Sequence, residues 1–289
     1  MKIAFQGERG SYAEAAAARL FANEDIATLP LRSYRAVFDA LADGEAEYAV
    51  VSLENTYAGP NTPLFDHLRQ HRCYLTRETR LTEIYSLAGS KGARLADIHR
   101  IYAHPVPLAL CQDFLERLRG VDIITRFDAA TSDMQVLQRA DKTEATVCSD
   151  YAASIYGLHI IQRGIQSQAE SVTRYAAIGR ELEIPPKDAD EPQTMVLFEL
   201  KHVVGAMLNV LTVMKKHGIS IHLMGSRPTR VNKWEYMIAM EFPGRATDKP
   251  IAAALKELKA HTTYLQLLGS YDRVDLGTNS GRFRPIRIK

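Results

Sequence analysis

The feature that most constrains the fold of this chain is a proline- and acid-rich stretch over residues 183–192, where the order of the expected strands and helices changes. Pro185, Pro186 and Pro192 stand there among alternating charges, and such a composition is typical of a segment between domains. A chain of 289 residues can hold a larger and a smaller domain. We therefore expect a larger domain over residues 1–183, a linker over 184–193, a smaller domain over 194–273 and a basic tail over 274–289.

Before the linker, short apolar strands alternate with helices. Residues 2–6 predict a strand, and residues 12–21 predict an alanine-rich helix. Further strands are expected over residues 48–53, 80–88, 98–103, 121–127, 145–148 and 159–161. Further helices are expected over residues 33–41, 108–118 and 150–156. The alternation predicts an α/β fold with mainly parallel sheets.

After the linker, the pattern changes to two helices set among four strands. Strands are expected over residues 194–200, 219–224, 234–242 and 264–268, and helices over 206–217 and 249–260. The resulting order is βαββαβ, which is that of ferredoxin-like domains. We expect both helices on one face of an antiparallel sheet.

Composition argues against several classes of protein. The 36 basic and 34 acidic residues are well mixed and give a formal net charge of +2, so nothing favours binding to nucleic acid or to a membrane surface. Cys73, Cys111 and Cys148 lack the spacing of a metal site or a disulfide framework. The N-terminus lacks the apolar region of a signal peptide, and no apolar run reaches the roughly 18 residues of a membrane span. We expect a cytoplasmic protein with reduced cysteines.

Four polar loops follow expected strands, at the place where α/β sheets bind ligands. They cover residues 7–12, 54–60, 103–107 and 128–132. Each loop by itself also fits a tight turn or a helix cap. None carries the glycine spacing of a phosphate-binding loop or of a dinucleotide fingerprint. Together with the start of the last strand at residues 173–175, and in the absence of a cofactor motif, they suggest a cleft for a small carboxylate.

A hydroxyl, a guanidinium and an aromatic ring open the last apolar run before the linker, at Thr173, Arg174 and Tyr175. The Thr173 hydroxyl can donate a hydrogen bond. Arg174 can hold a substrate carboxylate, or it can pair with Glu54 and fix the architecture. The sequence leaves these two roles of Arg174 open.

In this order, the motifs resemble those of prephenate dehydratases with a C-terminal ACT regulatory domain, over nearly the whole chain. The family's Gly-x-x-Gly-Ser/Thr-Tyr/Phe, Glu-Asn-Ser-x-x-Gly, Ser-His-Pro and Thr-Arg-Phe motifs correspond to residues 7–12, 54–59, 103–105 and 173–175. The Gly-Ala-Leu and Glu-Ser-Arg-Pro motifs of ACT domains correspond to residues 205–207 and 225–228. The chain departs from the family pattern at Ala13, Val106, Pro107, Ser167, Ser171 and Gly225.

The resemblance implies a catalytic unit of two α/β lobes with a cleft between them, like the type 2 periplasmic binding proteins. It implies conversion of prephenate to phenylpyruvate, water and carbon dioxide in phenylalanine biosynthesis, with no cofactor and no metal. It also implies a homodimer or homotetramer formed through the ACT and catalytic domains. L-Phenylalanine would bind between ACT domains as an allosteric effector.

For individual residues, the resemblance implies three groups. The catalytic residues are Thr173 and Arg174. The substrate-binding residues are Ser11, Tyr12, Asn55, Thr56, His104, Thr131 and Ser132. The residues that bind L-phenylalanine are Gly205, Ala206, Met207, Ser226, Arg227 and Pro228.

Prephenate is a dianion whose ring hydroxyl departs as carbon dioxide is lost. We expect Thr173 to stabilise the departing oxygen by a hydrogen bond. Two alternatives stay open. One is an arogenate dehydratase, whose substrate differs by an amine. The other is a catalytically impaired amino-acid-sensing protein of the same fold, which the departures at Ala13, Ser167 and Ser171 motivate.

Overall fold

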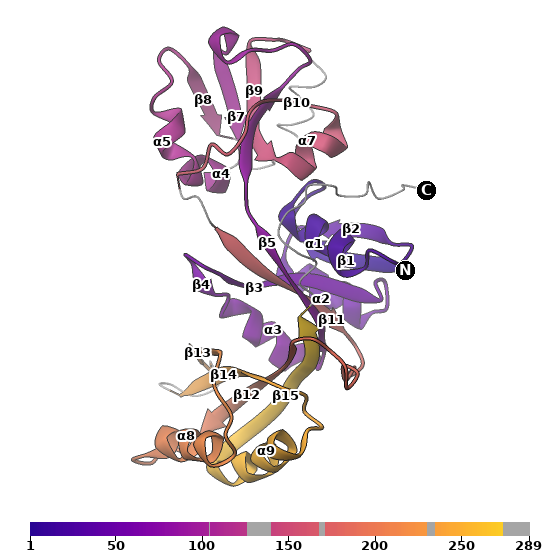
Figure 1. The fold of residues 1–289 in the computed structure, drawn as a ribbon, viewed down its shortest axis with the longest axis vertical. Coiled ribbons are helices and arrows are strands. Elements are labelled where there is room, and N and C mark those ends of the chain that lie inside the picture. The colour runs from indigo at the N-terminus through magenta and orange to yellow at the C-terminus, as the bar shows by residue number, and fades with distance from the viewer. Residues whose placement is uncertain (104, 126–139, 168–170, 230–234, 274–289) are drawn as a thin grey trace.

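Figure 1 shows the computed structural model of the chain, which describes residues 1–103, 105–125, 140–167, 171–229 and 235–273. Three bodies follow one another along the long axis of the view. We call the middle one lobe 1, the upper one lobe 2 and the lower one the ferredoxin-like part. The expected tail over residues 274–289 lies outside the described residues.

Each body combines strands and helices. Lobe 1 contains β1 (Lys2–Gln6), α1 (Tyr12–Leu20), β2 (Ala27–Leu31), α2 (Tyr34–Ala42), β3 (Tyr48–Asn55), β4 (Gly59–Pro60), α3 (Pro63–His71), β5 (Tyr74–Thr82) and β11 (Val172–Gly179). Lobe 2 contains β6 (Tyr85–Gly89), a short 3-10 helix (Leu95–Asp97), β7 (Arg100–Ala103), α4 (Pro105–Leu110), α5 (Gln112–Leu115), β8 (Asp122–Thr125), β9 (Glu144–Ser149), α7 (Asp150–Tyr156) and β10 (His159–Gln162). The ferredoxin-like part contains β12 (Pro192–Leu200), α8 (Ala206–Lys216), β13 (Leu223–Pro228), β14 (Tyr236–Pro243), α9 (Lys249–His261) and β15 (Thr262–Arg273).

Local signals in the sequence account for several helix ends. The Ser33 hydroxyl accepts a hydrogen bond from the backbone N–H of Ala36 at 3.2 Å and so caps α2. Ser149 caps α7 in the same way, through the N–H of Ala152. Gly157 ends α7 in the left-handed conformation, with φ of 68°. The α/β prediction therefore has a local basis in capping as well as in periodicity.

The sheets of the two lobes are mixed, so the expectation of mainly parallel sheets is wrong. In lobe 1, β1 pairs in parallel with β2 and β3, whereas β11 is antiparallel to both β3 and β5. In lobe 2, β7 is parallel to β8 and β9, and β6 is antiparallel to β9 and β10. The physical reason in lobe 1 is that β11 returns from lobe 2 and enters the sheet in the opposite direction (Figure 1).

The strand expected over residues 80–88 is in fact two strands in different sheets. β5 ends at Thr82 in the sheet of lobe 1, and β6 begins at Tyr85 in the sheet of lobe 2. Glu83 and Ile84 connect them. The chain returns to lobe 1 just before β11, and the N–H of Glu83 donates to the carbonyl of Ser171 at 2.7 Å. The two connections between the lobes are therefore hydrogen-bonded to each other.

In the ferredoxin-like part, the strand order is β13–β14–β12–β15 and every pairing is antiparallel. α8 and α9 lie together below this sheet in Figure 1, and their apolar faces pack on it through Val210, Met214 and Ile251. The predicted βαββαβ order is confirmed. The second strand begins at Leu223 rather than at residue 219.

One sheet runs through lobe 1 and the ferredoxin-like part. β15 pairs in parallel with β5, with Gly269 opposite Leu75 and Arg273 opposite Glu78. A Cβ atom at position 269 would lie 2.3 Å from the carbonyl oxygen of Leu75, so only glycine fits there without displacing a strand. This pairing joins segments on opposite sides of the linker, and no local pattern predicts it.

The three cysteines are buried free thiols, and burial raises the pKa of Cys73 and of Cys111 to about 12. Among the helices that the structure describes, none is long and apolar enough to cross a bilayer.

Candidate functional site

A cavity of about 480 Å³ lies where the two lobes meet. The end of β3, the turn into β4, the connection between β5 and β6 and the start of β11 form its wall, and Leu110 of lobe 2 contributes as well. Its polar lining includes Glu54, Asn55, Glu83, Ser171, Thr173 and Tyr175. The cavity therefore gathers two of the motifs that the sequence singles out.

The Thr173 hydroxyl is held from two sides in this cavity. It accepts a hydrogen bond from Asn55 Nδ2 at 2.8 Å and donates one to Glu83 Oε1 at 2.8 Å. The side chain is buried, with a relative exposure of 4%. Its oxygen is thus fixed in position, and its proton points to a carboxylate.

Asn55 is placed by its own turn. Its Oδ1 accepts hydrogen bonds from the backbone N–H groups of Tyr57 and Ala58, at 2.9 and 3.1 Å, which is the local pairing typical of an Asn at a turn. Its Nδ2 is then free to donate to Ser171 Oγ at 3.0 Å as well as to Thr173. The register of β3 and β11 sets Asn55 directly opposite Thr173. The sequence predicted both residues, and their contact is a result of the fold.

Glu83 is a site residue that sequence reasoning missed. Its carboxylate accepts from the hydroxyls of Thr173 and Tyr175, the latter at 3.3 Å. Burial raises the pKa of Glu83, and these two hydrogen bonds only partly oppose that effect. No salt bridge to Glu83 is present among the described residues. The available signal for Glu83 was the one acidic side chain among residues 81–85. It was not recognised because residues 80–88 were expected to form a single strand.

Arg174 follows Thr173 on β11 but is absent from the lining of the cavity. Its guanidinium donates to Glu54 at 2.9 Å, to both oxygens of Glu78 at 2.9 and 2.6 Å, and to Glu241 of β14 at 2.5 Å. Of the two roles left open by the sequence, the pairing with Glu54 is the one present in the structure. These carboxylates occupy the donors with which Arg174 could hold a substrate.

The other expected substrate residues lie in different places. Ser11 caps α1 by accepting from the N–H of Glu14 at 3.3 Å. The Tyr12 phenol donates to the carbonyl of Ile84 at 2.5 Å and accepts from its N–H at 2.6 Å, so it fastens the connection between the lobes. Thr56 Oγ1 accepts from the N–H of Val172 at 3.1 Å. None of these three lines the cavity. His104, Thr131 and Ser132 lie outside the described residues.

The residues expected to bind L-phenylalanine lie at the start of α8 and on β13. Gly205 has φ of 79° and precedes α8, whose first turn contains Ala206 and Met207. Ser226, Arg227 and Pro228 lie on β13, which forms one edge of the long sheet. Arg227 pairs with Asp66 of α3 at 2.6 Å, so this motif also touches lobe 1.

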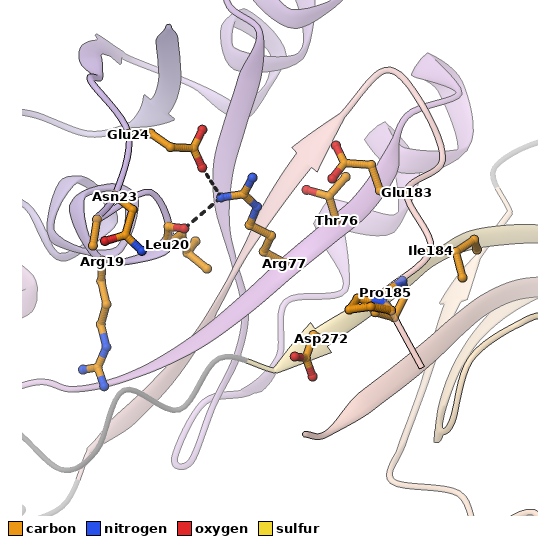
Figure 2. Close-up of a pocket in the computed structure, with 12 residues that line it drawn as sticks. Arg19, Leu20, Asn23, Glu24, Thr76, Arg77, Glu183, Ile184, Pro185 and Asp272 are labelled. Atoms are coloured by element: carbon orange, nitrogen blue, oxygen red, sulfur yellow. Dashed lines mark hydrogen bonds and ion pairs between the residues drawn. The ribbon is translucent and has the colours of Figure 1, made fainter. Parts of the chain in front are cut away.

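A second cavity, of about 440 Å³, lies between the end of α1, β5 and the linker (Figure 2). Figure 2 shows Arg77 bonded to Glu24 and to the carbonyl of Leu20, at 2.6 and 3.1 Å. Glu183 accepts from the phenol of Tyr48 at 2.7 Å. Because these charged groups are already paired, this cavity marks where the linker packs on lobe 1.

Comparison with known proteins decides the family. The family model of prephenate dehydratase matches residues 3–183. The chain belongs to the prephenate dehydratase family. As a member of this family it is an enzyme of the hydro-lyase class.

The similarity to known proteins extends beyond residues 3–183 and covers most of the chain. The arogenate dehydratase/prephenate dehydratase 2 of Arabidopsis thaliana is 29% identical over 280 residues, which are 94% of this chain and 72% of the relative. A prephenate dehydratase from Arthrobacter aurescens, solved in complex with L-Phe, is 27% identical, has a TM-score of 0.82 and aligns over 94% of this chain and 90% of its own. GqqA, described as a novel type of quorum quenching acylases, is 28% identical, has a TM-score of 0.83 and aligns over 95% and 98%.

Proposed function

We propose that the enzyme converts prephenate to phenylpyruvate, water and carbon dioxide in the cavity between its lobes. The observation that carries this proposal is the Thr173 hydroxyl, which lines that cavity and is held at 2.8 Å by both Asn55 and Glu83. Loss of carbon dioxide and of the ring hydroxyl makes the substrate ring aromatic, so the main barrier is the departure of a poor leaving group. A fixed donor beside the departing oxygen lowers that barrier.

The walls of the cavity suit the rest of the reaction. Pro60, Pro63 and Leu110 give it apolar surface, and a poorly solvated carboxylate loses carbon dioxide more readily. The Ser171 hydroxyl accepts from Asn55 and can donate its own hydrogen to another part of the substrate. His104, Thr131 and Ser132 remain predicted substrate contacts, and we assign Arg174 a structural role.

We propose further that L-phenylalanine binds the ferredoxin-like part as an effector. The complex of the Arthrobacter aurescens relative with L-Phe supports this, as does the helix N-terminus at Gly205, because such a terminus attracts a carboxylate. Val203, Val204 and Leu208 are exposed beside it. These exposed apolar side chains and the edge strand β13 favour a homodimer or homotetramer assembled through the ferredoxin-like part and the two lobes. We retain the cytoplasmic location as part of this proposal.

The test is to incubate the purified chain with prephenate at neutral pH and to follow phenylpyruvate. Formation above the spontaneous rate is expected, and its absence would overturn the proposal. A parallel incubation with arogenate measures the first alternative, since phenylalanine would form instead. Binding of L-phenylalanine without turnover of either substrate would support the amino-acid-sensing alternative.

One observation favours a second candidate activity. GqqA, which is described as an acylase, aligns with 95% of this chain. A hydroxyl that is hydrogen-bonded to a carboxylate also occurs in enzymes that hydrolyse their substrates through a nucleophilic hydroxyl. The same preparation should therefore be offered an acyl amide. Release of the carboxylic acid, with no turnover of prephenate, would replace the dehydratase proposal.

A further inference from the structure

Glu83 and Thr173 form a donor–acceptor pair whose direction depends on one proton. A threonine hydroxyl has one hydrogen to donate and two lone pairs that accept. In the structure, one lone pair accepts from Asn55, and the hydrogen goes to Glu83 Oε1. With Glu83 ionised, Thr173 therefore has no proton to give to a substrate.

Protonation of Glu83 reverses this arrangement without moving a heavy atom. The carboxyl O–H then donates to the second lone pair of Thr173, across the same 2.8 Å. The Thr173 hydrogen is released toward the cavity, while Asn55 still donates to the oxygen. Every hydrogen-bonding position of Thr173 is then used, and one of them points at the substrate.

We propose that Glu83 is the proton source of the dehydration and acts through the hydroxyl of Thr173. This inference rests on the proposed function. A threonine hydroxyl alone is too weak an acid to lose its proton outright, whereas a carboxyl group can resupply it as it leaves. In this role Glu83 orients the Thr173 hydroxyl and resupplies its proton. Thr173 is the group that touches the departing oxygen.

The surroundings of Glu83 favour the protonated form. Tyr175 of β11, Tyr12 of α1 and Tyr85 of β6 lie near it, and burial followed by nearby negative charge, including that of Glu83, raises the pKa of all three phenols. They are therefore neutral and do not balance a negative charge. Glu54 of β3 lines the same cavity, but Arg174 neutralises its charge. A dianionic substrate would raise the pKa of Glu83 further.

The step balances in atoms and charge. The bond between the ring and its hydroxyl oxygen breaks, and the oxygen takes the electron pair and the Thr173 proton to become water. The bond to the departing carboxylate breaks, and its electrons complete the aromatic ring. Thr173 takes the proton of Glu83, which is left ionised and regains a proton from solvent. The dianion and one proton thus give the phenylpyruvate monoanion, carbon dioxide and water.

The test compares the pH dependence of kcat in the wild type, Glu83→Gln and Glu83→Asp. The wild type should lose activity as pH rises through the pKa of Glu83 in the substrate complex. Glu83→Gln keeps a donor and an acceptor beside Thr173 but cannot transfer a proton, so kcat should fall by roughly 10²–10³-fold and that limb should vanish. Glu83→Asp should keep the limb at a lower kcat.

Tyr175→Phe provides a second readout that does not depend on the folding of Glu83→Gln. It removes a hydrogen bond that favours the ionised carboxylate, so the alkaline limb should move to higher pH. An active wild type together with a Glu83→Gln variant of unchanged profile, or a limb that Tyr175→Phe does not move, would overturn this inference alone. An inactive wild type would instead overturn the proposed function.

Discussion

Arg174 Nη2 lies 2.5 Å from Glu241 Oε1, and this contact joins the motif beside the cavity to the ferredoxin-like part. Arg174 is 12% exposed in its side chain, and Glu241 is fully buried. Around them, Glu78 bonds to both Arg174 and Arg273, so two largely buried cations share the fully buried Glu78 and Glu241, and the more exposed Glu54 and Glu191 complete the cluster. The balance of charge is what makes their burial tolerable.

Removing one member of this cluster should destabilise the protein strongly. Glu241→Gln leaves Arg174 and Arg273 with a single buried carboxylate between them. Loss of one partner of a buried pair typically costs about 3–5 kcal/mol, which chemical denaturation would measure. Asp39→Asn, in the exposed pair with Arg35, is the matched control and should change little. Equal effects of the two variants would contradict the role given to the cluster.

Thr173→Val should fold but lose most of its turnover, by roughly 10²–10⁴-fold in kcat. The valine has the shape of threonine and leaves Asn55 Nδ2 with its bond to Ser171. Thr173→Ser restores the hydroxyl and should recover much of the rate. Steady-state kinetics and circular dichroism together check this. Turnover of Thr173→Val within a few-fold of the wild type would remove the hydroxyl from the mechanism.

Glu83→Gln should be more stable than the wild type at neutral pH. A carboxyl whose pKa is raised in the folded state binds its proton more tightly there than in the unfolded chain. The wild type therefore loses stability as pH rises from the unfolded carboxyl pKa, about 4.3, toward the folded value. Thermal unfolding across pH should show the melting temperatures of the wild type and of Glu83→Gln converging below about pH 4. A difference in melting temperature that stays constant with pH would argue against this titration of Glu83.

The prediction for position 269 concerns the pairing of β5 with β15. Gly269→Ala would force a methyl group against the carbonyl of Leu75, and overpacking of this kind costs about 1–3 kcal/mol. Gly225→Ala is the control, because its nearest neighbour is Phe65 Cε2 at 3.4 Å, an ordinary contact. Urea unfolding of both variants measures the difference. An unchanged free energy of unfolding in Gly269→Ala would mean that β5 and β15 separate easily.

L-Phenylalanine should raise the melting temperature of the protein, because a ligand that binds only the folded state stabilises it by mass action. At one hundred times its Kd, the gain is about 2.7 kcal/mol. L-Lysine at the same concentration serves as the control for a general amino-acid effect. An unchanged melting temperature at millimolar L-phenylalanine would count against the regulatory assignment of the residues around Gly205 and Ser226.

Local chemistry explains what the sequence could predict. Helix caps such as Ser33 act over a few residues, so they can be read along the chain. Asn55 and Thr173 were recognised as polar groups at strand ends, although only the register of β3 and β11 brings them together.

Tertiary pairing explains what the sequence could not predict. The strand break at Glu83 arises because the chain changes sheets there, and no glycine or proline marks it. β2 was also missed because it is short and contains Pro30, and α3 was missed although Leu64, Phe65 and Leu68 give it an apolar face. The roles of Glu241 and Arg273 depend on a contact across the linker, which local patterns do not encode.

The pairing of β15 with β5 means that the linker does not separate two independent pieces of protein. A chain cut at residue 184 would expose the backbone edge of β5 along Leu75 and Glu78, and uncovered edges of this kind recruit other strands. Its lobes would be prone to aggregation rather than simply freed from control. Lobe 1 and the ferredoxin-like part should accordingly melt in one cooperative transition, so an effector bound at the far end of the sheet would stabilise the same unit that holds Thr173.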